Sequence, residues 1–88
     1  MNKYDLEFIG LIEKIGLENL KKRLRVPRTI EIVCRKLGLE GYSPHTYKDI
    51  IKVCSVSQQR VEQIYQRARI IARAMVYYNY EYNVTKKQ

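Results

Sequence analysis

The sequence has few residues of the kinds that hold metal ions or form disulfides. Its 88 residues include two cysteines, one histidine and no tryptophan. Cys34 and Cys54 stand 20 positions apart, no CxxC pair occurs, and the only histidine is His45. A structural zinc site needs four Cys or His ligands, and a disulfide framework needs several cysteines. We therefore expect no metal, no cofactor and no disulfide, and we expect both thiols to be buried.

Long apolar runs are also absent from the sequence. The longest ones span a handful of residues, whereas a membrane helix needs about 20. The first residues, Met1 to Asp5, show no secretory pattern, so we expect a cytoplasmic protein. A chain of this length buries only about 60 to 65% of its unfolded surface. This predicts a single domain over residues 1–88 and excludes a large two-lobed enzyme cleft.

Acidic residues are scarce, with nine Asp and Glu against 17 Lys and Arg, which gives a formal net charge of +8. Apolar residues make up 45% of the chain, enough to build a core. No pair of titratable groups, and no base beside a cysteine or serine, forms a pattern typical of catalysis. His45 follows Pro44 in a loop-forming stretch, and we assign it no chemistry. We expect a basic, globular binding domain and not an enzyme.

Apolar residues recur at helical spacing along the chain, and no strand-like alternation occurs. The spacing predicts an all-α fold, a small bundle of about five helices. The expected helices cover residues 4–15 up to Gly16, a short stretch from Leu17 that Pro27 ends, Pro27 to Leu37 before Gly38, Tyr47 to about Cys54 after the cap Thr46, and a long stretch after the cap Ser57. The apolar line of the last helix is Val61, Ile64, Ala68, Ile71 with Ala72, and Met75.

The most informative unit is a helix-turn-helix pattern at about residues 46–76. It combines a short capped helix, a three-residue turn with Val56 buried at its centre, and a longer helix with a polar outer face. The residues expected to fix the crossing of the two helices are Ile50, Val53 or Cys54, Val56, Val61 and Ile64. The outer face carries Gln58, Gln59, Glu62, Gln63 and Gln66, with Arg60, Arg67, Arg69 and Arg73 around it.

This order of side chains suits double-stranded DNA. A major groove admits one α-helix, and glutamine amides pair with adenine there, while arginines bind phosphates. The expected base-reading residues are Gln58, Gln59 and Gln63, and the expected phosphate contacts are Arg60, Arg67, Lys48 and Arg69. A polar outer face is also what any solvated helix shows. A protein-interaction module that does not touch DNA is therefore the alternative.

Several motifs of the C-terminal half resemble region four of bacterial sigma-70 family factors. They are Gly38-Leu39-Glu40-Gly41, Pro44-His45-Thr46, Asp49-Ile50, Val56-Ser57, Arg60-Val61, Gln63-Ile64 and Arg67-Ala68, and they align without gaps from 38 to about 73. The resemblance implies recognition of a promoter −35 element and docking of the preceding helices on the RNA polymerase flap. It places the base readers at Gln58, Gln59 and Gln63.

The chain departs from that family at the residues that choose bases. Gln58 and Gln59 stand where an Arg-Glu pair is commoner, and Glu62 stands where a basic residue is frequent. A carboxylate at 62 either accepts from a cytosine amino group or repels a phosphate, so we do not expect an inherited promoter preference. The chain also has no room for the segment that melts promoters. We therefore do not expect a complete initiation factor.

A second resemblance spans more of the chain. It involves Ile15-Gly16, Arg28-Thr29, Ile30-Glu31, Tyr47, Asp49-Ile50, Lys52, Arg60-Val61-Glu62, Ala68 and Ala72. These are similar to the DNA-binding effector domain of the sporulation master response regulator. Arg23-Leu24 replaces the Gly-Tyr segment typical of that domain, so it is the second choice. Both resemblances imply DNA binding.

Two segments keep alternative interpretations. The basic cluster Lys21, Lys22, Arg23 and Arg25 either touches flanking phosphates or forms a soluble face. A Tyr-rich tail at about residues 77–88 contains Tyr77, Tyr78, Tyr80 and Tyr82. We expect this tail to pack back on the core. A homodimer contact and stacking on unpaired bases are the alternatives.

Overall fold

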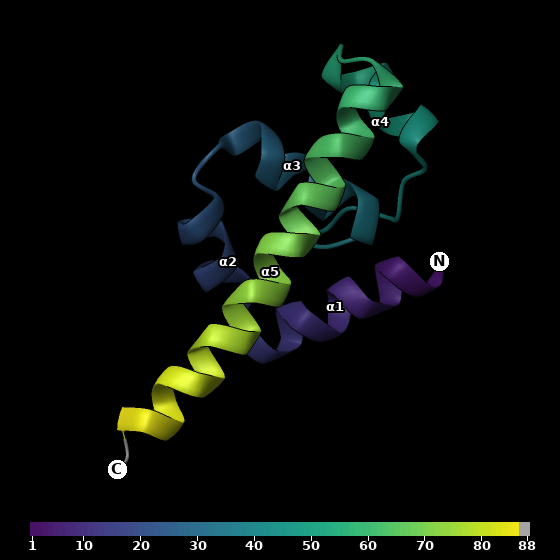
Figure 1. Ribbon diagram of the computed structural model, residues 1–88. Coiled ribbons are helices and arrows are strands. Elements are labelled where there is room, and N and C mark those ends of the chain that lie inside the picture. Colours follow the sequence, from purple (N-terminus) through teal and green to yellow (C-terminus); the bar gives the residue numbers. More distant parts are fainter. Residues whose placement is uncertain (87–88) are drawn as a thin grey trace.

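The computed structural model describes the backbone of residues 1–86 and the side chains of residues 1–78. This part of the chain is entirely helical apart from its connections, which confirms the predicted all-α bundle (Figure 1). The helices are α1 (Lys3–Ile15), α2 (Leu17–Leu24), α3 (Pro27–Leu37), α4 (Tyr47–Cys54) and α5 (Gln58–Lys86). The first four agree with the expected ranges. None of the helices in the described part combines the length and apolar character needed to cross a membrane.

Polar side chains fix where the last two helices begin. Thr46 Oγ1 accepts from the backbone N–H of Asp49 at 3.1 Å, and the Asp49 carboxylate accepts from Thr46 N–H at 3.1 Å. This reciprocal pair is a capping box. Ser57 Oγ accepts from the N–H of Arg60 at 3.2 Å. Both predicted caps, Thr46 and Ser57, are confirmed.

The predicted loop between α3 and α4 begins at a glycine that no other residue replaces easily. Gly38 ends α3 with a φ of 69°, in the left-handed region. A Cβ added there would lie 2.7 Å from the Pro44 ring. At the other end of the loop, the N–H of His45 donates to the carbonyl of Arg35 at 2.9 Å. The loop is therefore held against α3, and this positions the start of α4.

Helix α5 is the axis on which the other helices pack. Helices α1, α3 and α4 all contact it, and its C-terminal part extends past the rest of the molecule (Figure 1). Its buried side is a stripe formed by Val61, Tyr65, Ala68 and Ala72, spaced four, three and four residues apart as helical geometry requires. The other buried members of the core are Phe8, Ile12, Ile15, Leu20, Ile32, Val33, Leu37, Ile50 and Cys54.

The core differs from the expected one at the helix-turn-helix. Ile50, Cys54 and Val61 are buried as predicted, but Val53 is 53% exposed. The expectation that Val56 is buried is met only in part. Val56 and Ile64 pack against the core, but both are half-buried because they also line a surface groove. The turn is therefore covered from one side only.

The two cysteines are buried and free, as expected. Burial raises the pKa of the Cys34 thiol to about 11, and the neighbouring Glu40 carboxylate acts in the same direction. The Cys34 thiol donates to Glu40 Oε1 at 3.5 Å. Both features keep Cys34 protonated at neutral pH.

The Tyr-rich segment does not pack back on the core at the two positions that are described. Helix α5 continues through it to Lys86, because residues 77–86 contain no glycine or proline to stop the helix. Tyr77 and Tyr78 are 59% and 67% exposed, since this part of α5 extends past the other helices. The side chains of Tyr80 and Tyr82 lie outside the described residues.

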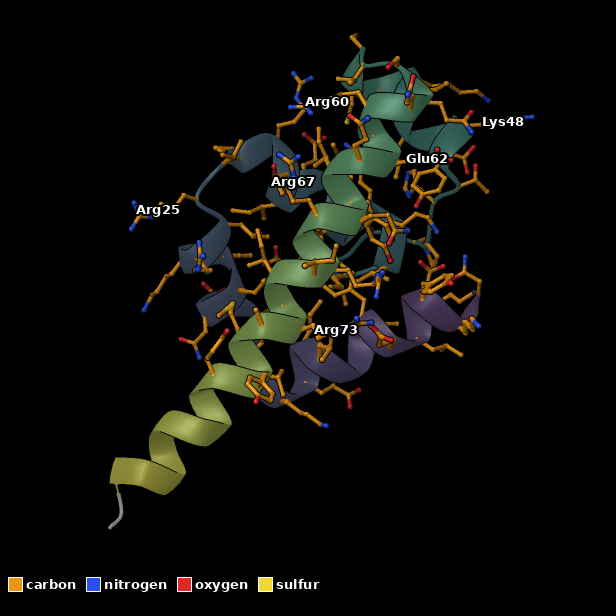
Figure 2. The ribbon with its side chains drawn as sticks, viewed as in Figure 1. Arg25, Lys48, Arg60, Glu62, Arg67 and Arg73 are labelled. Atoms are coloured by element: carbon orange, nitrogen blue, oxygen red, sulfur yellow. The ribbon has the colours of Figure 1, made fainter. Side chains whose placement is uncertain are left out.

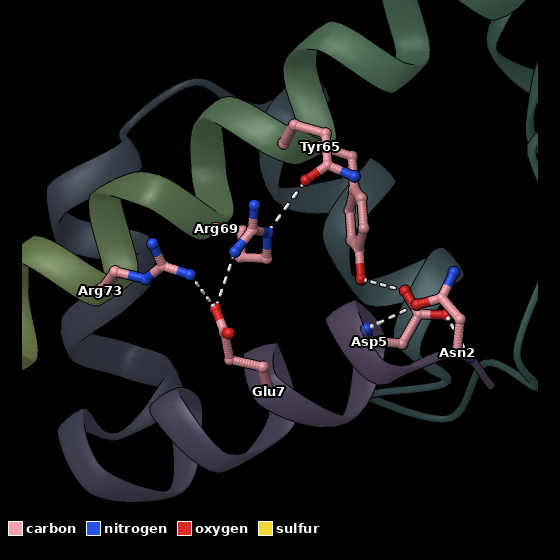
Figure 3. Close-up of polar contacts among 7 residues, drawn as sticks. Asn2, Asp5, Glu7, Tyr65, Arg69 and Arg73 are labelled. Carbon is pink, nitrogen blue, oxygen red and sulfur yellow. Dashed lines mark hydrogen bonds and ion pairs between the residues drawn. The ribbon is translucent and has the colours of Figure 1, made fainter.

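A buried polar cluster at Tyr65 joins three helices, and Figure 3 shows its contact between Tyr65 and Asp5. The Tyr65 hydroxyl donates to Asp5 Oδ1 at 2.6 Å, and Lys36 Nζ donates to Asp5 Oδ2 at 3.0 Å. The Tyr65 ring lies against Phe8 and Tyr47, with centroids 5.4 and 6.0 Å apart. Lys36 Nζ lies 5.0 Å from the Tyr47 centroid. The cluster therefore ties α1 and α3 to α5 at a point where all its polar atoms have partners.

The cluster shifts the titration of its members in opposite directions. Burial by itself raises the pKa of Asp5, but hydrogen bonds from Tyr65 and Lys36 and the Lys36 charge outweigh it and leave the pKa lowered. Burial, followed by the bond to Asp5, raises the pKa of Tyr65. At neutral pH the carboxylate is therefore ionised and the phenol is a donor.

We predict that Tyr65→Phe lowers the free energy of unfolding by about 1 to 3 kcal/mol, because the buried Asp5 carboxylate loses a donor that water cannot replace. Tyr78→Phe removes a hydroxyl from an exposed tyrosine and is the control. Urea unfolding followed by circular dichroism measures both. Equal stability of the two variants would contradict the role of the cluster.

Acid should weaken the same cluster. Because the folded pKa of Asp5 is lowered, its stabilising contribution is complete above the unfolded pKa of about 3.9 and is lost as the pH falls through the folded pKa. Stability measured from pH 7 to pH 2 should fall more steeply for the native chain than for Asp5→Asn. Parallel pH profiles would show that Asp5 is not the responsible group.

Candidate nucleic-acid interface

Helices α4 and α5 follow each other in the order expected of a helix-turn-helix. The connection is Ser55, Val56 and Ser57, and the two helices pack against each other. Ser55 ends α4 with a φ of 51°, a left-handed conformation that stops the helix. The first turn of α5 consequently lies at one end of the molecule (Figure 1).

The glutamines of α5 do not all lie on one face. On a helix of 3.6 residues per turn, Gln59 and Gln63 each lie about 160° from the buried Val61, on either side of the opposite direction. Gln58 lies only about 60° from Val61, on a flank. All three side chains are exposed. The structure therefore brings Gln59 and Gln63 together and leaves Gln58 beside them, where its Nε2 is 3.5 Å from Glu62 Oε1.

Two predicted phosphate contacts share one flank of α5. Arg60 and Arg67 are both exposed and point to the same side of the helix (Figure 2). They are seven residues apart, about 10.5 Å along the axis. In the described residues neither has a carboxylate within ion-pair distance. Lys48, also exposed, projects from α4 on the other side in Figure 2.

Arg69 lies on a different side and is already engaged (Figure 3). Its Nη1 donates to Glu7 Oε1 at 2.7 Å, and its Nε donates to Gln66 Oε1 at 2.9 Å. The guanidinium lies 5.0 Å from the Tyr4 ring centroid, and only 11% of the side chain is exposed. Because Arg69 is bound in this way, we no longer propose it as a phosphate contact.

Glu7 holds a second arginine on the same side. Arg73 Nη2 donates to Glu7 Oε1 at 2.7 Å. The hydrogen bonds from Arg73 and then Arg69 lower the pKa of Glu7, so the pair of arginines faces an ionised carboxylate. Glu62 also lies away from the Arg60 and Arg67 flank (Figure 2). One flank of α5 is thus basic, and the other carries compensating acidic groups.

The basic cluster of Lys21, Lys22, Arg23 and Arg25 also contains both an ion-paired side chain and one that projects outward. Lys21 forms ion pairs with Glu18 and Glu40. Arg25 instead projects outward from the connection between α2 and α3, on the same side of the molecule as Arg60 (Figure 2). The sequence carries no signal that they share a side, because the two arginines are 35 positions apart.

We predict different consequences for two neighbouring arginines. Arg69→Ala should lower the urea midpoint, because it removes one of the two arginine links between α5 and Glu7 and uncovers Tyr4. Arg67→Ala should leave the midpoint unchanged, since its side chain has no such partner. Equal midpoints for Arg69→Ala and the native chain would contradict the structural role of Arg69.

The surface that results has Gln59 and Gln63 at its centre, Arg60 and Arg67 along one edge and Lys48 at the other. In the described residues, no cluster of His, Cys, Asp or Glu side chains has the arrangement needed to hold a metal ion. No protein-family model, no curated protein and no solved structure matches the chain.

Proposed function

We propose that this chain is a sequence-specific regulator of transcription that binds double-stranded DNA through the first turns of α5. The observation that carries the proposal is the position of Gln59 and Gln63. Both are exposed on the side of α5 opposite its buried stripe, at the end of the helix that the turn leaves uncovered. A major groove about 12 Å wide accepts a helix presented in this way.

Each part of the surface has a role in the proposed complex. Gln59 and Gln63 pair with base edges, and each amide suits the donor and acceptor pattern of adenine. Gln58 reads a base at the edge of the same site. Arg60 and Arg67 bind phosphates of one strand and Lys48 binds a phosphate on the opposite side of the groove. The net charge of +8 favours the approach to DNA.

The resemblance to sigma region four extends the proposal to partners. It makes a promoter element the DNA target and RNA polymerase a protein partner, and it places the activity in the cytoplasm. The weaker resemblance, to the sporulation-type effector domain, implies the same DNA-binding role. In all of these the chain acts by binding and performs no chemical step.

A protein-interaction adaptor is the second candidate function. The observation that favours it is a carboxylate next to the expected base readers. Glu62 is half-buried on the flank of α5 away from Arg60 and Arg67, and its Oε1 lies 3.5 Å from Gln58 Nε2. A carboxylate so close to the glutamines opposes a nearby phosphate. An adaptor would use the same helices to occupy polymerase or another factor without touching DNA.

The test begins with selection of duplexes from a random pool by the full chain. With three phosphate contacts, affinity for the selected duplex should fall about 40-fold between 50 and 200 mM salt. Gln63→Ala should cost about 1 to 3 kcal/mol on that duplex and relax one base pair. Arg67→Ala should weaken selected and random duplexes alike and reduce the salt slope by about one.

Arg69→Ala serves as the matched control, because its guanidinium faces Glu7 and should leave the salt slope unchanged. Fluorescence anisotropy gives all the affinities. Failure to bind selected or random duplex at low salt would reject DNA binding and favour the adaptor. Identical effects of Gln63→Ala and Arg67→Ala on both duplexes would reject the separate roles of these residues.

A further inference from the structure

A groove of about 550 Å³ lies between the α2–α3 connection and the Arg60 and Arg67 flank of α5. Its apolar lining comes from three places in the chain. The residues concerned are Leu24, Val26, Val56, Ile64, Ala68 and Ile71. Val26 is 53% exposed. The volume lies within the range of about 300 to 1,000 Å³ that is typical of ligand sites.

Two turns of the chain meet at this groove. Arg25 ends α2 with a φ of 66° and a ψ of −38°, whereas Ser55 ends α4 in the left-handed region with a φ of 51° and a ψ of 40°. Each is a non-glycine residue with a positive φ, and a valine follows it directly. In the first turn the N–H of Val26 donates to the Leu24 carbonyl at 2.7 Å. Both valines, Val26 and Val56, line the groove.

The charges around the groove have a single sign. Arg28, Arg60 and Arg67 line it, and none of its lining residues is acidic. Arg28 Nη1 donates to the Cys54 carbonyl at 2.8 Å, which ties the start of α3 to the end of α4. Arg25 projects on the same side of the molecule (Figure 2). The groove thus combines apolar walls with a basic rim.

We propose that this groove is a docking site for an acidic amphipathic helix of a partner protein. Such a helix places apolar side chains at i, i+3 or i+4, and i+7 into a groove. Its carboxylates meet the arginines of the rim. The spacing of Arg60 and Arg67, about 10.5 Å, equals seven residues of a ligand helix, so acidic residues two turns apart reach both.

The apolar walls separate this occupant from nucleic acid. A DNA backbone supplies phosphates for the arginines but leaves Leu24 and Val26 in contact with water. An acidic amphipathic helix both covers the valines and neutralises the arginines of the rim. Because the partner occupies Arg60 and Arg67, its binding and DNA binding exclude each other. The docking site itself does not rest on the proposed DNA binding, since the groove exists in the chain alone.

The test uses the full chain and a displayed library of random 16-residue peptides. Peptides that bind should carry net negative charge and apolar residues at helical spacing. Val26→Asp should lower the affinity of the chain for an enriched peptide at least tenfold. Val53→Asp should change its affinity less than twofold, because Val53 is another valine with 53% exposure, on α4, that does not line the groove.

Val26→Thr is the second variant and keeps the shape of the side chain, so it addresses a failure of Val26→Asp to fold. It should weaken the peptide about fivefold, since one methyl group is replaced by a hydroxyl. Circular dichroism confirms the fold of each variant. Addition of the peptide to a complex with selected duplex should release the duplex.

Three results would overturn the proposal. One is enrichment of no peptide, or of peptides without acidic residues and apolar periodicity. Another is unchanged peptide affinity in both Val26 variants. A third is loss of duplex affinity in Val26→Thr equal to the loss of peptide affinity, which would assign the groove to DNA. Peptide binding by a chain that binds no duplex would reject the proposed function and leave the docking site standing.

Discussion

Tyr65 fixes the rotation of α5 about its own axis, because its ring and its hydroxyl are both buried. The ring fills the space between Phe8 and Tyr47, and the hydroxyl reaches the Asp5 carboxylate, which also pairs with Lys36. A rotation of α5 by one residue, about 100°, would leave this carboxylate with an unpaired side in a dry environment. The buried cluster therefore decides which residues of α5 face outward, and the glutamine face follows from that decision.

Helix α1 also determines how charge is distributed along α5. Asp5 accepts a hydrogen bond from Tyr65, and Glu7, two residues later, binds Arg69 and Arg73. The arginines on that side are consequently neutralised locally, whereas Arg67 on the other side has no carboxylate within ion-pair distance among the described residues. The functional consequence is a directional surface. The basic edge of α5 continues toward the α2–α3 turn and the apolar groove, so both proposed ligands approach from the same side.

Local signals in the sequence predicted most of the fold, because helix caps, glycine stops and apolar spacing act over a few residues. The failures involve partners that are distant in the chain. Tyr65 is absent from the predicted apolar line because its burial depends on Asp5, 60 positions earlier, and Arg69 depends on Glu7, 62 positions earlier. Ile64 packs against the core as its apolar character predicts, but it is only half-buried because it also lines the groove. The long extension of α5 was accessible from sequence, since no helix-stopping residue follows Met75 up to Lys86.

The central claim is that the outward face of the first turns of α5 is a DNA-reading surface. An amide NMR titration of the full chain with its selected duplex at low salt tests this most directly. The account predicts that the shifted resonances cluster between Gln58 and Arg67 and at Lys48, with α1 unchanged. Shifts concentrated on α1 or at Tyr77 and Tyr78, with the first turns of α5 unaffected, would contradict it.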